Sequence, residues 1–245
     1  MIDMPAPGPR EFNTTHWSLV GAAQSDEASR TQARNALEEL CRAYWYPLYA
    51  FVRNRGHSSV DAQDLTQSFL VQFIETGGFA SADRERGRFR TYLLGAMKHF
   101  LANEWHRDRR LKRGGAVTFL EWDALAPEAR YALEPQHLSD PDMVFDREWA
   151  VELTARAREK LRAESEASGK SELFNVLQGS LTADAPDRSM AAARLGMTEG
   201  AVKVAVHRLR HRYRELLRAE IADTVGAKPE IDDEMRYLIA VLRSR

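Results

Sequence analysis

The segment that most constrains the fold lies near the end of the chain, at residues 189–218. Its sequence is SMAAARLGMTEGAVKVAVHRLRHRYRELLR. Gly196 permits the positive φ of a tight turn, and Thr198 can cap a helix that begins directly after it. The pattern therefore predicts a short helix, a glycine turn and a longer helix.

The longer helix is expected to be buried on one side and basic on the other. Apolar residues recur at helical spacing, at Val202, Val206, Leu209, Tyr213 and Leu216. The other side carries basic residues, at Lys203, His207, Arg208, Arg210, His211, Arg212 and Arg214. A helix of this kind, held at an angle by a glycine turn, suits the major groove of DNA.

The net charge of the chain, −1 at pH 7, hides a strong separation of charge along it. Residues 84–113 contain ten Lys and Arg against three acids, a net charge of +7. Residues 189–218 contain seven against two, a net charge of +5. Residues 119–152 contain nine acids against two Arg, a net charge of −7. Two basic surfaces on either side of an acidic connector keep nucleic acid as a candidate partner, although the net charge of the whole chain does not suggest it.

Composition narrows the class of protein further. The 44% apolar and 29% charged residues are typical of a folded chain rather than a disordered one. We expect no membrane insertion, because no run of about 18 apolar residues occurs and residues 1–17 do not resemble a signal peptide. A single cysteine, Cys41, excludes an internal disulfide framework. It suits a reducing compartment, so a cytoplasmic location is expected.

The remaining pattern is helical and contains no sustained strand alternation. Helical spacing of apolar residues occurs at about 30–52, 58–75, 89–111, 145–166, 173–181 and 231–242. The expected fold class is all-α, with two small helical domains joined by a flexible acidic linker. The predicted boundaries are an N-terminal extension 1–24, a first domain 25–113, the linker 114–145, a second domain 146–222, and a C-terminal extension 223–245 with an amphipathic helix.

Three segments, in this order, resemble a bacterial RNA polymerase sigma factor of the extracytoplasmic-function type. They are DAQDLTQ at 61–67, the basic segment from Phe89 to Arg110, and the helix-turn-helix from Met190 to Arg214. One helix-turn-helix alone is shared by many regulators, whereas three segments in the family's order are specific. The resemblance implies that the first domain is a sigma region 2-like bundle and the second a sigma region 4-like domain.

The resemblance implies a partner for each segment. The first is expected to bind RNA polymerase through polar side chains, at Asp61, Gln63, Asp64 and Gln67. The second is expected to melt and contact the downstream (−10) promoter element, through Arg88, Arg90, Lys98, His99, Asn103, His106, Arg107 and Arg110. Planar and cationic side chains suit this role, because unstacked bases and a single-stranded backbone need stacking partners and positive charge. The third is expected to recognise the upstream (−35) element, through Thr198, Glu199, Gly200, Lys203, Val204, His207, Arg208 and Arg210.

The chain departs from the family at Val204–Ala205. The family frequently has a polar residue followed by arginine at these two positions. An exposed Val204 can touch a thymine methyl group. One expected cation is missing, however, so the base preference of relatives does not transfer to this chain.

Two segments keep more than one interpretation. The acidic linker is either a solvated tether or a segment that occupies the basic RNA path of the polymerase. The C-terminal helix has an apolar stripe, at Ile231, Met235, Leu238, Ile239 and Leu242. We expect this stripe to pack back on the domain that recognises the upstream element. The alternatives are that it binds a regulator or masks the DNA-facing surface.

No residues indicate catalysis, since the chain has no glycine-rich phosphate loop and no nucleophile motif. His207 and His211 have the spacing of metal ligands on a helix, but the surrounding arginines repel cations. We therefore expect a protein that is not an enzyme and that has no metal site and no cofactor.

The sequence leaves two other functional classes open. The main alternative is an autonomous helix-turn-helix regulator that binds duplex DNA without polymerase. A weaker alternative is a protein-interaction module. The resemblance favours a promoter-specificity subunit, whose partners are core RNA polymerase and promoter DNA. Members of this family commonly also bind an anti-sigma regulator, although no residue here identifies one.

Overall fold

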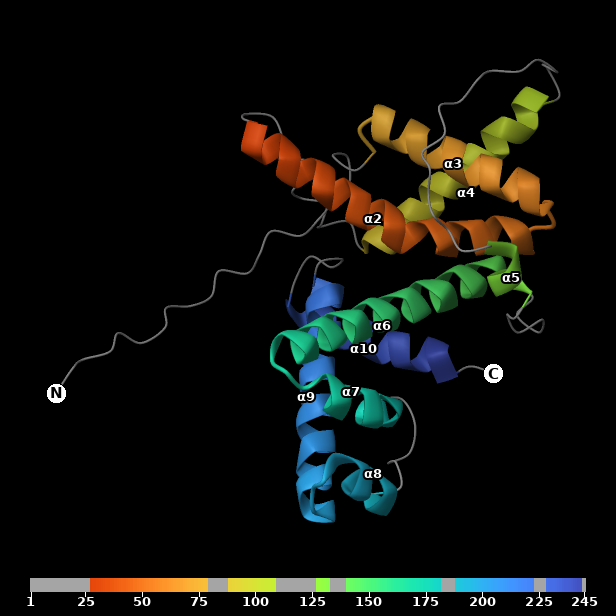
Figure 1. Ribbon diagram of the computed structural model, residues 1–245. Coiled ribbons are helices and arrows are strands. Elements are labelled where there is room, and N and C mark those ends of the chain that lie inside the picture. Colours follow the sequence, from red (N-terminus) through yellow and green to blue (C-terminus); the bar gives the residue numbers. More distant parts are fainter. Residues whose placement is uncertain are drawn as a thin grey trace.

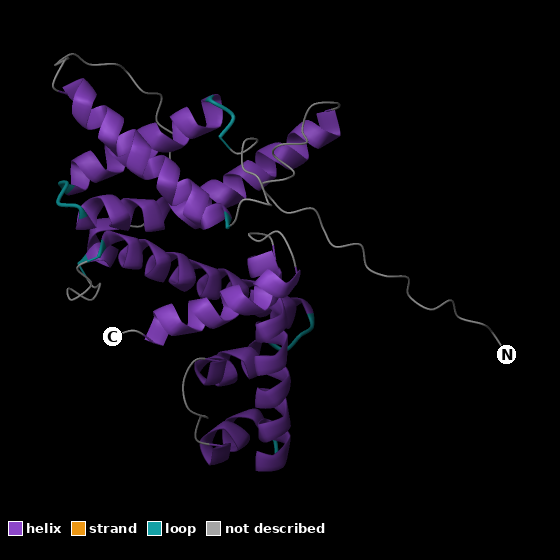
Figure 2. Ribbon diagram, turned by 180° about the vertical axis from the view of Figure 1, so that it is seen from behind, coloured by secondary structure: helices purple, strands orange, loops and turns teal. Residues whose placement is uncertain are grey.

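The computed structural model of the protein describes residues 27–78, 88–108, 127–132, 140–181, 188–222 and 228–243. Within these ranges every regular element is helical, which confirms the all-α prediction for the described residues (Figure 2). The elements are α2 (Glu27–Asn54), α3 (Ser59–Glu75), α4 (Phe89–Asp108), α5 (Pro127–Tyr131), α6 (Pro141–Ala167), α7 (Ser171–Leu177), the 3₁₀ turn η2 (Gln178–Leu181), α8 (Arg188–Leu195), α9 (Glu199–Ala222) and α10 (Lys228–Arg243). The predicted N-terminal extension 1–24 and residues 114–126 and 133–139 of the predicted linker lie outside the described residues.

The packing of α2 against α6 forms the centre of the molecule (Figure 1). α2 contributes Tyr44 and Leu48, and α6 contributes Phe145 and Trp149, all of them buried. Aromatic side chains bury large areas, so a contact made of them is strong. The buried residues of the first and second halves of the chain belong to one continuous cluster. The two predicted domains thus share a core in this structure, while the predicted boundaries between them stay a prediction.

The bend of α2 and the start of α6 both follow from local sequence. α2 bends along its length (Figure 1), as expected for a helix that contains Pro47. α6 begins at Pro141, whereas the apolar spacing of the sequence predicted a helix that begins at about Phe145. The side chain of Asp140 accepts a hydrogen bond from the Asp142 backbone N–H at 3.0 Å, and proline is tolerated at a first helical position. Pro141 therefore starts a helix instead of extending the linker.

The short helix α5 carries residues 127–131 of the predicted linker onto α2. The carboxylate of Glu128 accepts hydrogen bonds from the Tyr49 hydroxyl at 2.6 Å and from Arg53 at 2.6 and 3.0 Å. The bonds from Arg53 and then Tyr49 hold the pKa of Glu128 below its ordinary value. Arg130 pairs with Glu148 of α6 at 3.1 Å. These residues of the predicted linker are therefore docked on both neighbouring helices.

The C-terminal helix α10 packs on α6 and α9, which confirms the expectation that it folds back on this part of the chain. Its buried positions are Ile231, Glu234, Leu238 and Val241. The predicted stripe was wrong at Ile239 and Leu242, which are exposed. The face of α10 that packs on α6 and α9 is instead centred on Glu234, a buried acid that the stripe did not include. In Figures 1 and 2, α2, α3 and α4 lie on one side of α6. α9 extends away from the other side of α6, and α8 packs beside the end of α9 that is farthest from α6. The α4 region and the start of α9 therefore lie toward opposite ends of the molecule.

Candidate nucleic-acid interface

The predicted helix-turn-helix is present, with the caps that the sequence indicates. α8 ends at Leu195, and Gly196 follows with a φ of +62°. The Met197 N–H donates to the Ala192 carbonyl at 3.0 Å, the long hydrogen bond of a glycine-terminated helix. The hydroxyl of Thr198 accepts a hydrogen bond from the Ala201 N–H at 3.2 Å and so caps α9. Local backbone chemistry alone therefore sets the turn between the two helices.

Gly196 and Gly95 give a matched pair for testing this turn. A Cβ would meet no atom within 4 Å at either position, but only Gly196 has a positive φ. Gly196→Ala is expected to lower the free energy of unfolding by about 1–2 kcal/mol, the cost of a left-handed residue with a side chain. Gly95→Ala, inside α4, should raise it by about 0.5–1 kcal/mol. Denaturant titration measures both, and equal effects of the two changes would contradict the role of the turn.

One face of α9 is buried and the opposite face is open to solvent. The predicted apolar stripe is confirmed in full, at Val202, Val206, Leu209, Tyr213 and Leu216. Seven of the eight residues predicted to contact the upstream element are exposed, at Thr198, Glu199, Gly200, Lys203, Val204, His207 and Arg208. The side chain of Val204 is on this open face, and the residue is 49% exposed. The first turns of α9 thus present a mixed polar, cationic and apolar surface.

Of the eight residues predicted to contact the upstream element, Arg210 is the one that does not lie on the open face. It is half-buried, and its Nε donates to the Ser180 carbonyl of η2 at 2.7 Å. Arg212, also predicted on the basic side, pairs with Glu164 of α6 at 2.7 Å. The hydrogen bond from Arg212 holds the pKa of Glu164 below its ordinary value. Both arginines therefore fix α9 to its neighbours, because each lies far enough along the helix to reach them.

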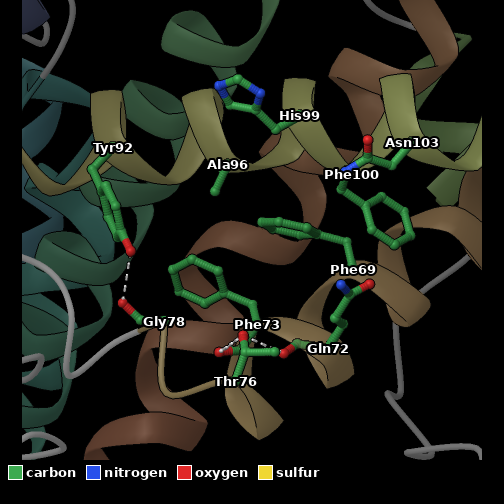
Figure 3. A pocket seen from close by; sticks show the side chains of 10 residues that line it. All are labelled: Phe69, Gln72, Phe73, Thr76, Gly78, Tyr92, Ala96, His99, Phe100 and Asn103. Atoms are coloured by element: carbon green, nitrogen blue, oxygen red, sulfur yellow. Dashed lines mark hydrogen bonds between the residues drawn. The ribbon is translucent and has the colours of Figure 1, made fainter.

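The region expected to contact the downstream element contains a cavity between α3 and α4 (Figure 3). It has a volume of about 300 Å³ and is lined mainly by aromatic and polar side chains, by Phe69, Gln72, Phe73, Thr76, Gly78, Tyr92, Ala96, His99, Phe100 and Asn103. Two of the predicted contact residues, His99 and Asn103, are exposed and belong to its α4 side. The rings of Phe69 and Phe73 point into the space between the helices (Figure 3). The arrangement offers flat apolar surfaces beside groups that form hydrogen bonds.

Tyr92 and Gly78 belong to the lining of this cavity. Tyr92 falls in the segment 89–111, whose apolar residues recur at helical spacing, but it is 38% exposed and its hydroxyl donates to the Gly78 carbonyl at 3.0 Å. Gly78 lies so close to Phe73 that a Cβ would come within 2.6 Å of the ring. A glycine is therefore required where the chain leaves α3, and this close approach shapes the wall of the cavity.

The other predicted downstream contacts are distributed differently. Lys98 is half-buried and pairs with Asp142 of α6 at 2.5 Å. His106 and Arg107 belong to α4, but their side chains are outside the described residues, as is the whole of Arg110. Arg88 pairs with Glu234 of α10 at 2.8 Å and keeps a partly exposed side chain. Of the predicted set, His99 and Asn103 are thus the residues that the structure describes as freely exposed.

Arg90, which was predicted to contact the downstream element, has its side chain buried among three helices in this structure. Its guanidinium pairs with Asp146 of α6 and, at 2.6 Å, with Glu234 of α10. It also lies over the rings of Trp149 and Tyr237, at 4.9 and 4.4 Å from their centroids. Desolvation acts to lower the pKa of Arg90, but the hydrogen bond to Glu234 and the nearby carboxylates raise it above its ordinary value. The side chain is therefore a charged, structural contact.

The predicted polymerase-binding residues follow one another along α3. Asp61 and Asp64 are exposed, whereas Gln63 and Gln67 are half-buried. Ser58 caps the helix, accepting from the Asp61 N–H at 3.1 Å and donating to the Asp61 carboxylate at 2.7 Å. The structure therefore places two carboxylates in solvent on the first turns of α3. A feature that the sequence analysis missed is Val60, which is 66% exposed beside them.

The described residues hold no group of three or more His, Cys, Asp and Glu side chains that could bind a metal ion. None of the described helices is both long enough and apolar enough to cross a membrane. The chain matches no known protein-family model, no curated protein and no solved structure.

Proposed function

We propose that this chain is a sigma-type promoter-specificity subunit of bacterial RNA polymerase. The observation that carries the proposal is the capped turn between α8 and α9, with an open face that starts at Thr198 and includes Lys203 and Arg208. A recognition helix contacts base edges through its first turns, and these turns are the exposed ones here. Arginine and lysine can bind guanine or phosphate, and an exposed valine can contact thymine. This face supports recognition of duplex DNA.

The cavity between α3 and α4 supports contact with a second, unpaired stretch of DNA. Bases removed from a duplex are stabilised by stacking on aromatic rings and by hydrogen bonds to their edges. Phe69 and Phe73 supply rings, and His99 and Asn103 supply exposed polar groups from α4. Melting of a promoter produces unpaired bases, and such a base could enter this cavity. The cavity thus fits the downstream role proposed for α4.

The exposed acids of α3 support binding to a protein partner. Asp61 and Asp64 project from the first turns of a helix whose other face is buried through Ala62, Phe69 and Phe73. An interaction with the polymerase would use charges that the fold itself leaves free in solvent. Charges of this kind control association and partner choice more than they control folding.

Asp64→Arg tests this assignment. The substitution is expected to weaken binding to core RNA polymerase by about tenfold or more, because it reverses a charge at the proposed contact. Binding to duplex DNA should not change. The matched control is Glu75→Arg, an exposed acid at the other end of α3. Fluorescence anisotropy with the labelled protein measures both affinities, and normal core affinity of the Asp64 variant would contradict the polymerase contact.

The proposal as a whole is tested by comparing two binding partners of the purified chain. We expect the chain to form a complex with core RNA polymerase and to recognise specific promoter DNA as part of that complex. Size-exclusion chromatography detects the complex, and footprinting detects the DNA contact. Sequence-specific binding to duplex DNA by the free chain, without any complex with the polymerase, would instead identify an autonomous regulator.

A further inference from the structure

A buried acid of α10 occupies two arginines at the start of α4. Glu234 is 1% exposed in its side chain, and its carboxylate pairs with Arg88 at 2.8 Å and with Arg90 at 2.6 Å. Tyr237, one turn further along α10, donates a hydrogen bond to Asp146 and lies beside both guanidinium groups. The contact joins residues that are 144 positions apart in the sequence. The C-terminal helix therefore closes over a cationic site that the rest of the chain builds.

The occupied arginines have the chemistry of a phosphate-binding site. A guanidinium donates to a carboxylate and to a phosphate through the same planar arrangement of N–H groups. Arg88 and Arg90 lie immediately before and within the first turn of α4, the helix that also carries His99 and Asn103. A nucleic-acid backbone that reached this end of α4 would need the donors that Glu234 now holds.

We propose that α10 is an autoinhibitory latch, in which Glu234 takes the place of a nucleic-acid phosphate at Arg88 and Arg90. This inference rests on the proposed function and adds a means of regulation to it. The same N–H groups cannot serve both anions, so closure of α10 and binding of single-stranded DNA at this end of α4 exclude each other. Only the open fraction of molecules binds, and the apparent affinity falls in proportion to that fraction.

A second contact ties the latch to the recognition helix. Asp232 of α10 pairs with Arg218 of α9 at 2.5 Å, and both side chains are largely exposed. α10 is thus attached to α9 on one side and to α4 on the other. Opening of the latch would release the start of α4 from the helix that carries the upstream-element face.

The latch is tested with Glu234→Gln in the full chain, using two independent readouts. Labelling of Arg90 by phenylglyoxal, followed by mass spectrometry, reports exposure of its guanidinium without reference to DNA. Binding of a single-stranded DNA oligonucleotide of about 12 nucleotides reports the competition. The matched control is Asp233→Asn, which removes one charge from an exposed position of the same helix. Asp232→Arg is the second variant, since it repels Arg218 at the surface and leaves the buried cluster intact.

We expect Glu234→Gln to accelerate labelling of Arg90 and to tighten oligonucleotide binding by a similar factor, about tenfold, within the range usual for conformational coupling. Asp232→Arg should also accelerate labelling of Arg90 and tighten oligonucleotide binding, by a smaller factor than Glu234→Gln. If Glu234→Gln does not fold, Asp232→Arg provides the test. Asp233→Asn should behave as the unaltered protein. Unchanged labelling of Arg90 in folded Glu234→Gln and Asp232→Arg would overturn the latch.

The DNA readout separates failure of the latch from failure of the proposed function. Faster labelling without tighter binding, in a protein that does bind the oligonucleotide, would overturn the competition between Glu234 and phosphate. Faster labelling with no binding by any variant would support closure of Arg90 by α10 and contradict the DNA role of this surface.

Discussion

Arg90→Ala is expected to lower the free energy of unfolding by about 3–5 kcal/mol, the usual cost of breaking a buried ion pair from one side. The Arg90 guanidinium is the cation that pairs with both Asp146 and Glu234, whose side chains are 13% and 1% exposed. Its removal leaves Asp146 without that cation, while Glu234 keeps its ion pair with Arg88. The ring faces of Trp149 and Tyr237 also lose a cation. Urea or guanidinium titration followed by circular dichroism measures the change.

Two controls separate the effect of buried charge from a general effect of losing an arginine. Arg236→Ala removes a largely exposed arginine that pairs with Asp233 within α10. We expect no measurable change in Tm for this variant. The triple variant Arg90→Met, Asp146→Leu and Glu234→Met should recover much of the loss, because well-packed apolar groups often replace a whole buried ionic cluster at little cost. An equal, small loss for Arg90→Ala and Arg236→Ala would show that the cluster does not hold α4, α6 and α10 together.

The second large effect is expected on the open face of α9. Lys203→Ala and Arg208→Ala should each weaken binding of the upstream element by about 1–3 kcal/mol if these side chains contact base edges. Neither substitution should affect folding, because both side chains are exposed on the side opposite the buried stripe. Electrophoretic mobility shift with the polymerase complex, on promoter variants that differ at single positions, measures the affinity and its dependence on sequence.

The pattern across promoter variants distinguishes base recognition from phosphate contact. A residue that contacts a base loses discrimination at one position when it is replaced. A residue that contacts phosphate weakens all sequences alike and lowers the salt dependence. Arg236→Ala serves as the control for loss of positive charge, since it lies on α10. Unchanged affinity for every promoter variant in both α9 substitutions would rule out this face as the upstream contact.

The elements defined by local chemistry were predictable from the sequence. The turn at Gly196, the cap at Thr198 and the buried stripe beginning at Val202 all depend on neighbours within a few residues. Spacing of 3.6 residues per turn also identifies the exposed side of such a helix, which is why Val204 was correctly placed in solvent. For these features the sequence carries all the necessary information.

The contacts between distant helices were not predictable in the same way. Arg90, Glu220 and Glu234 all occupy positions on the buried face of their helices, where periodicity leads one to expect apolar residues. A charged residue at such a position is a usable signal that a partner of opposite charge lies opposite it. The signal does not identify the partner, because Arg90 and Glu234 are 144 residues apart and only tertiary packing brings them together. The same reason explains why the cavity beside Tyr92 was missed.

The most direct test of the central claim is a run-off transcription assay with purified core RNA polymerase, this chain and a panel of promoter templates. We expect transcripts that begin at defined positions only when the chain is added. Lys203→Ala and Arg208→Ala should reduce them on promoters that depend on the upstream element, and Arg236→Ala should not. Specific binding of the chain to duplex DNA, with no transcript on templates that carry the bound sequence, would contradict a role as a promoter-specificity subunit.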